Sequence, residues 1–295
     1  MNGASQSAFA PAKINLYLHV TGRRTDGYHL LDSLVAFADI GDEVTAAPAA
    51  HFSLEVAGPE AAALEGVGDD NLVLRAAHRL AAYYGITAGA ALSLEKRLPI
   101  ASGIGGGSSD AAAAARALAR LWDRPLDAGA VAALSDLGAD LPACLAAMPV
   151  WVGGIGEELE AADGLPEAGI VLANPRRPLP TPSVFHARTG AFSQPARFAP
   201  RPADAAGLAA ALAERRNDLT EAAIGLMPKI GTVLDRLAHL PGALLARMSG
   251  SGATCFALFA DRAAAREAGT MLAAAEPGWW SAGGRLLPHS LDDRD

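Results

Sequence analysis

The chain has few cysteines, no long apolar run and no excess of basic residues, and each shortage excludes a class of protein. Its 295 residues include only two cysteines, Cys144 and Cys255. Both lie in apolar stretches of sequence, so we expect two buried thiols in a reducing compartment. A disulfide scaffold, a zinc site and a cysteine nucleophile are thereby excluded as working hypotheses.

Apolar runs are too short for a membrane protein. The longest stretch without a charged residue extends from Leu141 to Gly156 and is interrupted by proline and glycine. A membrane-spanning helix needs roughly 20 apolar residues, so none is expected. The segment from Met1 to Ala12 has neither a basic start nor an apolar run, and it does not match a secretory signal. We therefore expect a cytoplasmic protein.

The charge balance is acidic, with 24 Lys and Arg against 32 Asp and Glu and a formal net charge of −8. Proteins that bind nucleic acids present clustered Lys and Arg to the phosphate backbone, and no long basic run occurs here. The composition therefore predicts a small-molecule partner, not nucleic acid or a membrane. It does not indicate an oligomeric state.

The length corresponds to about two domains of roughly 150 residues, and we expect the second to begin near Gly153, giving domains 1–152 and 153–295. Period-2 alternation predicts antiparallel strands between about residues 14 and 56, the first with one buried face, and a short strand near 91–94. Gly85 is placed to end a helix. Helical spacing predicts helices over 73–84, 110–122, 127–137, 141–148, 208–216 and 220–240.

The most informative segment runs from Pro99 to Asp110 and leads into an alanine-rich helix. Glycines let a backbone approach an anion, the following helix offers unpaired N–H groups, and serines add hydroxyl donors. A flexible turn with a serine cap is the alternative, but so many glycines would lose conformational entropy without any gain in packing. The segment therefore predicts a cradle for a triphosphate. Its residues are Pro99, Ile100, Ala101, Ser102, Gly103, Ile104, Gly105, Gly106, Gly107, Ser108, Ser109 and Asp110.

Other nucleotide-binding loops do not match this sequence. No Lys-Ser/Thr follows the last glycine, as a Walker loop requires, and no correctly spaced G-x-G-x-x-G for a dinucleotide fold is present. The triplets that mark protein kinases are also absent.

Three blocks resemble the motifs of the GHMP kinase family. The glycine segment resembles that family's phosphate loop, residues 10–16 resemble its first motif, and residues 248–254 resemble its third. Ala101 and Ser102 depart from the family pattern, which often has glycine there. The resemblance implies ATP and Mg²⁺ as cofactors. It also implies an α+β fold in two lobes, a ribosomal-protein-S5-domain-2-like N-terminal lobe and a ferredoxin-like C-terminal lobe.

Further stretches resemble one branch of the family, at residues 23–29, 138–142, 180–182 and 216–219. That branch uses ATP to phosphorylate a hydroxyl of an anionic cytidyl diphosphate alcohol in isoprenoid precursor biosynthesis, and the resemblance implies the same activity here. Two alternatives remain open: a related kinase for mevalonate, homoserine or a sugar, and a sensor that holds ATP without transferring phosphate.

The resemblance also implies that Lys13 and Asp140 are the catalytic pair. A carboxylate near the acceptor hydroxyl can take its proton or orient it, while a lysine stabilises phosphate charge. The residues alone leave simpler alternatives, an exposed lysine at a strand edge for Lys13 and a helix cap for Asp140.

Substrate-binding residues follow from the same resemblance. Tyr28 and His29 match positions that recognise cytosine, by ring stacking and by hydrogen bonds to the base edge. Packed aromatics at the start of a strand are the alternative. The other implied residues are Asn15 and Thr181 at the alcohol or diphosphate end, Gly250, Ser251 and Gly252 in a turn near the substrate, and Asn71 and Lys96 at the nucleotide. Ser108, Ser109 and Asp110 are candidates for contact with Mg²⁺.

Overall fold

The computed structural model describes residues 4–64, 66, 68–199 and 201–288. The chain divides into two compact units that alternate along the sequence. Unit 1 comprises Met1–Ala12, Gly41–Ile100 and Gly105–Ala146, and unit 2 comprises Lys13–Ile40, Ala101–Ile104 and Ala147–Asp295. The long strands β1 (Gln6–Arg23) and β2 (His29–Ala49) pair with each other and contribute residues to both units.

Residues 1–3, part of the segment tested for a secretory signal, lie outside the described residues. The domain division at residues 152 and 153 stays a prediction about family domains.

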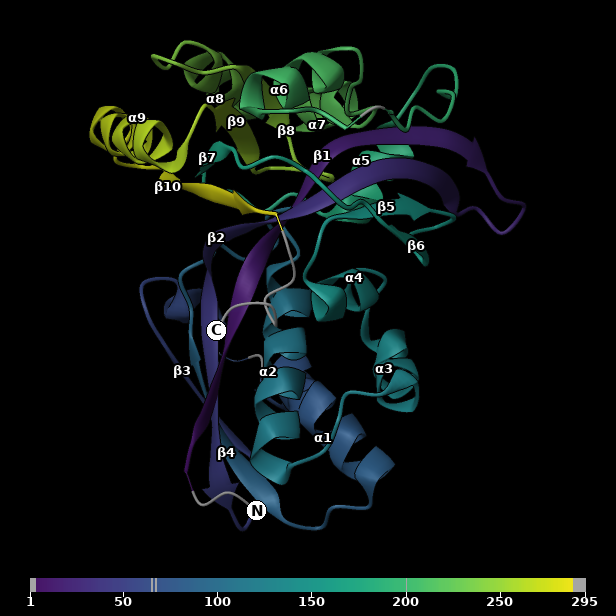
Figure 1. The fold of residues 1–295 in the computed structure, drawn as a ribbon, viewed down its shortest axis with the longest axis vertical. Coiled ribbons are helices and arrows are strands. Elements are labelled where there is room, and N and C mark those ends of the chain that lie inside the picture. The colour runs from purple at the N-terminus through teal and green to yellow at the C-terminus, as the bar shows by residue number, and fades with distance from the viewer. Residues whose placement is uncertain (1–3, 65, 67, 200, 289–295) are drawn as a thin grey trace. The chain divides into compact units, whose positions relative to one another are not determined.

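Unit 1 contains a small sheet with helices beside it. Strand β4 (Gly89–Glu95) pairs antiparallel with residues 43–49 of β2 and parallel with β3 (Ser53–Ala57). Helix α1 (Leu72–Tyr84) packs along α2 (Gly106–Trp122), as Figure 1 shows. The remaining elements of this unit are the 3₁₀ turns η1 (Ala61–Leu64), η2 (Gly68–Asp70) and η3 (Ser135–Leu137) and the helices α3 (Ala128–Leu134) and α4 (Leu141–Ala146).

Helix α2 is the central helix of unit 1. Every residue from Ser109 to Ala119 is buried, because α1, α4 and β4 all contact this helix. Alanine side chains are small enough to allow such close approach on several sides. The glycine segment therefore enters a helix that is firmly held along its length.

Unit 2 is built around antiparallel strands in the order β10-β7-β9-β8. Their bounds are Trp280–Leu287, Gly169–Asn174, Cys255–Phe259 and Leu245–Met248. Helices α8 (Lys229–Ala238) and α9 (Arg262–Ala275) pack on this sheet around Val171 and Phe259. The unit also contains β5 (Val150–Gly153), β6 (Glu158–Ala161), α5 (Thr181–Ala187), α6 (Ala205–Ala213) and α7 (Thr220–Leu226).

Several expectations about local structure are confirmed and others are wrong. Gly85 ends α1 in the left-handed region, with φ of 65°, as predicted. The single helix expected over 220–240 is instead α7 and α8, separated at Met227 and Pro228, because proline lacks the N–H that would continue the helix. Helix α2 starts at Gly106, four residues before the expected Asp110.

Strand β1 differs from the expectation of one buried face. Its polar residues Asn15, Tyr17 and His19 are buried as well. Burial is possible because each side chain has a partner: Ser33 Oγ for Asn15, Asp32 for Tyr17 and the Gln194 carbonyl for His19.

The mixed α+β class is confirmed, and both cysteines are buried free thiols, as expected. Across the part of the chain that the structure describes, no helix has the length and apolar character needed to cross a membrane.

Candidate active site

The glycine segment turns through left-handed backbone at Ala101, Gly103 and Gly105, whose φ angles are 47°, 74° and 64°. Gly105 directly precedes α2, and its carbonyl accepts the first helical hydrogen bond, from Ser109 N at 2.8 Å. The first amides of a helix have no acceptor within it and hold a partial positive charge. Those at residues 106–108 are therefore the donors that this segment offers to a phosphate.

The two serines at the start of α2 have different surroundings. Ser109 is buried, and its hydroxyl donates to the Pro11 carbonyl at 2.7 Å. Ser108 lies beside Gly138, because a Cβ placed on that glycine would be 3.5 Å from Ser108 Oγ. Asp140 follows two residues later, and its carbonyl accepts a hydrogen bond from Cys144 N at 3.0 Å as α4 begins. Unit 1 thus brings the candidate phosphate cradle close to the segment that contains Asp140.

Lys96 is held between two carboxylates in unit 1. Its side-chain Nζ lies 2.5 Å from Asp42 Oδ2 and 2.7 Å from Asp110 Oδ2. Asp42 Oδ1 also accepts hydrogen bonds from Arg97 N at 2.6 Å and Leu98 N at 2.8 Å. Burial lowers the pKa of Lys96, but the charges of Asp110 and Asp42 outweigh it and leave that pKa above its ordinary value. Burial, with the charge of Asp42, raises the pKa of Asp110 despite the neighbouring ammonium.

These contacts give Lys96 a clear structural role in fixing the strand end that leads into the glycine segment. Asn71 has one too, because its Oδ1 accepts a hydrogen bond from Val73 N at 3.0 Å and caps α1. Contact of either side chain with a nucleotide stays a prediction.

In unit 2, a second glycine turn meets the glycine segment. Gly250 and Gly252 have φ angles of 54° and 84°, within the turn that joins β8 to β9. Ser249 Oγ donates to the Gly103 carbonyl at 3.2 Å and accepts from Asn15 N at 3.1 Å. A Cβ on Gly103 would lie 2.5 Å from the Gly252 carbonyl, so only glycine fits at that position. Strand β1, the glycine segment and this turn therefore form one connected cluster.

Lys13 and Asn15 lie on β1 within this cluster. The Lys13 amide donates to the Ile104 carbonyl at 3.0 Å, and Asn15 Nδ2 donates to Ser33 Oγ at 2.8 Å. Lys13 is only 6% exposed, so it is not the solvated strand-edge lysine of the simpler alternative.

An aromatic contact joins the start of β2 to α5. His29, at the start of β2, stacks on Phe185 of α5 with ring centroids 5.1 Å apart and planes inclined by 26°. Tyr28 is 61% exposed beside it in sequence. Thr181, one helical turn before Phe185, has its Oγ1 2.7 Å from Ser251 Oγ. The structure thus links the aromatic pair to the glycine turn through α5.

The pKa of His29 lies below its ordinary value, first because of burial and then because of the positive charges of Arg23 and Arg188. The neutral imidazole is therefore favoured, and a neutral ring can both donate to and accept from a pyrimidine edge.

Sequence reasoning missed Phe185 and Ser249. Phe185 had a signal, since its spacing of four from Thr181 places both on one side of a helix. Ser249 lies within the block 248–254 that resembles the third motif, but nothing local indicated its two partners, which come from distant parts of the chain. Lys13 belongs to unit 2 and Asp140 to unit 1, and their joint action stays a prediction.

Two family models match this chain. Residues 71–147 match the model of the GHMP kinases N terminal domain, and residues 201–277 match that of the GHMP kinases C terminal domain. The chain belongs to the GHMP kinase family, and the expected fold class is confirmed.

Its relatives include proteins named 4-diphosphocytidyl-2-C-methyl-D-erythritol kinase. The one from Paramagnetospirillum magneticum is 55% identical over 96% of this chain and 99% of its own length. The one from Rhodospirillum rubrum is 52% identical over 94% of this chain and 91% of its own length. A crystal structure of 4-(cytidine 5'-diphospho)-2C-methyl-D-erythritol kinase superimposes with a TM-score of 0.76 at 35% identity, over 95% of this chain and 98% of that one.

Proposed function

We propose that this protein transfers the γ-phosphoryl group of ATP to the 2-hydroxyl of 4-diphosphocytidyl-2-C-methyl-D-erythritol. The products are the 2-phosphate and ADP, in a step of the methylerythritol phosphate pathway to isoprenoid precursors. The protein acts in the cytoplasm, where ATP is available as the donor. Its relatives named for this activity support the choice of substrate.

The observation on which the proposal depends is the junction between the glycine segment and α2. Left-handed Gly105 exposes the first amides of a long, buried helix, and Ser108 lies against the segment that contains Asp140. Amides at a helix start bind phosphate oxygens without any side-chain charge. These amides would donate hydrogen bonds, in a fixed orientation, to the terminal phosphate of a triphosphate bound there.

In the proposed reaction, Asp140 orients the acceptor hydroxyl and takes its proton as the new P–O bond forms and the bond from the γ-phosphorus to the leaving ADP breaks. Lys13 holds the terminal phosphate and stabilises the negative charge on its oxygens. Phosphoryl transfer has little covalent chemistry for a protein to assist, so alignment and charge stabilisation supply most of the rate enhancement.

Mg²⁺ would enter with ATP and neutralise charge on the phosphate oxygens. Among the described residues, no group of three His, Cys, Asp or Glu is placed to hold a metal ion. The Ser109 hydroxyl is already bonded to Pro11, and Asp110 Oδ2 to Lys96. The partly exposed hydroxyl of Ser108 is the group that fits an ion bound mainly by phosphate and water.

Selection of the cytidyl substrate is assigned to Tyr28, His29 and Phe185. Stacking on an aromatic face is worth roughly 1–3 kcal/mol per base. The neutral imidazole of His29 adds hydrogen bonds to the base edge. Asn15 and Thr181 bind the alcohol or diphosphate end, beside the turn of Gly250, Ser251 and Gly252.

Product analysis tests the proposal directly. The purified protein is incubated with MgATP and 4-diphosphocytidyl-2-C-methyl-D-erythritol, and the product is examined by mass spectrometry and ³¹P NMR. We expect one added phosphoryl group as a monoester, together with ADP. Mevalonate, homoserine and galactose serve as comparison acceptors. Equal phosphorylation of any of these would refute the proposed specificity, and tight ATP binding without turnover would favour a nucleotide sensor.

A further inference from the structure

We propose that Asn217 is a positioning residue for phosphoryl transfer, acting through the glycine turn between β8 and β9. The kinetic part of this inference rests on the proposed function, whereas its structural part does not. Within the part of the chain that the structure describes, the side chain of Asn217 bonds to backbone groups only. It acts on the backbone that carries the predicted substrate residues of the turn.

The side-chain amide of Asn217 makes three hydrogen bonds within unit 2. Its Nδ2 donates to the carbonyls of Met248 and Gly250, each at 2.8 Å, and its Oδ1 accepts from Leu219 N at 2.9 Å. The residue is 5% exposed. One amide group therefore ties two carbonyls on either side of Ser249 to the loop before α7.

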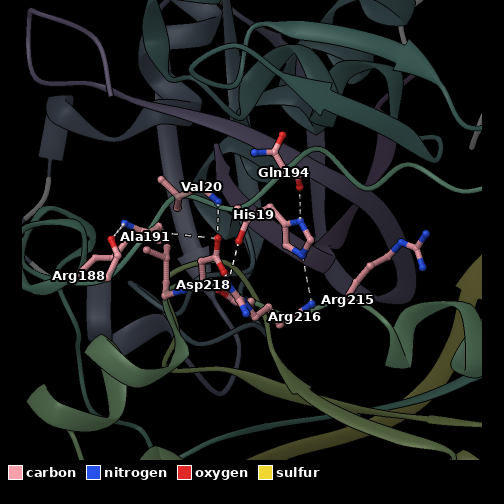
Figure 2. A network of polar contacts seen from close by, with 12 residues as sticks. His19, Val20, Arg188, Ala191, Gln194, Arg215, Arg216 and Asp218 are labelled. Carbon is pink, nitrogen blue, oxygen red and sulfur yellow. Dashed lines mark hydrogen bonds and ion pairs between the residues drawn. The ribbon is translucent and has the colours of Figure 1, made fainter. Parts of the chain in front are cut away.

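The loop that carries Asn217 is itself fixed to β1 on both sides of the residue. Arg216 O accepts from Leu18 N at 3.1 Å, and Asp218 N donates to Leu18 O at 2.8 Å. Figure 2 shows the side-chain contacts of the same segment: His19 Nε2 accepts from Arg216 N, and Asp218 Oδ2 accepts from Val20 N at 2.8 Å. Hydrogen bonds to β1 thus hold the loop on both sides of Asn217.

The two carbonyls that Asn217 holds flank the groups that reach the candidate site. Ser249, between them, bonds both Asn15 N and the Gly103 carbonyl. Ser251, just after them, bonds Thr181 Oγ1. Fixing Met248 and Gly250 therefore fixes two hydroxyls that contact β1, the glycine segment and α5.

Position 217 needs a side chain that donates two hydrogen bonds, because the carbonyls of Met248 and Gly250 can only accept. An aspartate side chain at this position would have the same shape, but its ionised carboxylate cannot donate and would face two carbonyl oxygens. An error of about 1 Å in alignment can cost roughly 10²-fold in rate, so a loosened turn should be visible in kcat.

The test compares Asn217→Asp with Asn174→Asp. Asn174 is also a buried amide of unit 2, and its Nδ2 donates to Thr254 Oγ1 at 2.9 Å. A threonine hydroxyl can reverse its role and donate to the new carboxylate, so the control keeps its contact while receiving the same chemical change. We measure kcat, KM for each substrate, the unfolding midpoint, and amide hydrogen exchange at Ser249 and Gly252, whose N–H groups close the turn.

For Asn217→Asp we expect kcat to fall about 10- to 100-fold with KM for ATP within about threefold of wild type. Exchange should rise at Ser249 and Gly252 but not elsewhere in unit 2, and Asn174→Asp should show neither change. If Asn217→Asp does not fold, Asn217→Ser, which removes the amide without adding charge, is measured in its place with the same expectations.

Wild-type kcat and turn protection in the Asn217 variant would overturn the inference. So would equal loss of activity in both variants in proportion to their folded fraction, since that describes a structural role. If wild-type protein transfers no phosphate, the proposed function fails on its own, and the exchange measurement still decides whether Asn217 holds the turn.

Discussion

The imidazole of His29 lies over the phenyl ring of Phe185, with the ring centroids 5.1 Å apart. The two residues come from β2 and α5, so the stack joins the start of a strand to a short helix of the same unit. Helix α5 also presents Thr181 to Ser251 of the glycine turn. Helix α5 therefore connects the residues proposed to recognise the base with the glycine turn.

Phe185→Leu should raise KM for the cytidyl acceptor by about fivefold or more, because stacking on an aromatic ring is worth roughly 1–3 kcal/mol per base. KM for ATP should not change. Phe192→Leu is the control, since Phe192 is exposed and its ring contacts Arg188, not a histidine. Steady-state kinetics with each substrate varied in turn gives both values. An unchanged acceptor KM in Phe185→Leu would remove this residue from the site.

Asp140→Asn and Lys13→Met should each lower kcat by about 10²- to 10⁴-fold, the usual contribution of a general base or of a charge placed at the transferred phosphate. Asp136→Asn is a matched control, because Asp136 is an exposed aspartate of η3 in the same unit as Asp140. Circular dichroism confirms that each variant is folded. Turnover near the wild-type value in either variant would end its catalytic assignment.

Local patterns allowed much of the fold to be predicted from sequence. Gly85 ends α1 because glycine adopts left-handed backbone, and the strand expected near residues 91–94 is β4. Pro228 was a visible signal that the helix over 220–240 would break, but the apolar spacing continues through it and concealed the break.

Contacts between distant segments could not be predicted in this way. The buried polar face of β1 depends on Ser33, Asp32 and Gln194, none of which is close to its partner in sequence. The stack of Phe185 on His29 and the bonds of Asn217 also join segments that are far apart in the sequence. Motif resemblance indicated the residue types at the site, and tertiary packing determines what each of them contacts.

Lys96→Met should lower the free energy of unfolding by about 3–5 kcal/mol, because Asp42 and Asp110 would face each other in the core without a cation. Adding Asp110→Asn removes one carboxylate and should recover part of that loss. Arg97→Met is the control, since the pair between Arg97 and Glu95 is long, at 3.9 Å, and exposed. Urea denaturation measures all three. If Lys96→Met loses no more free energy of unfolding than the control, the two buried carboxylates do not depend on the Lys96 charge.

The acceptor KM should depend on pH through His29. Its pKa is lowered by burial and by Arg23 and Arg188, so the imidazole stays neutral at pH 7 and gains a proton only as the pH falls below the ordinary histidine value of about 6.5. Protonation removes the ring's acceptor, so KM should be flat between about pH 7 and 8 and rise at lower pH. His29→Gln has no titrating ring, and its KM should be higher but independent of pH over that range. Identical pH profiles for the two proteins would show that another group is responsible.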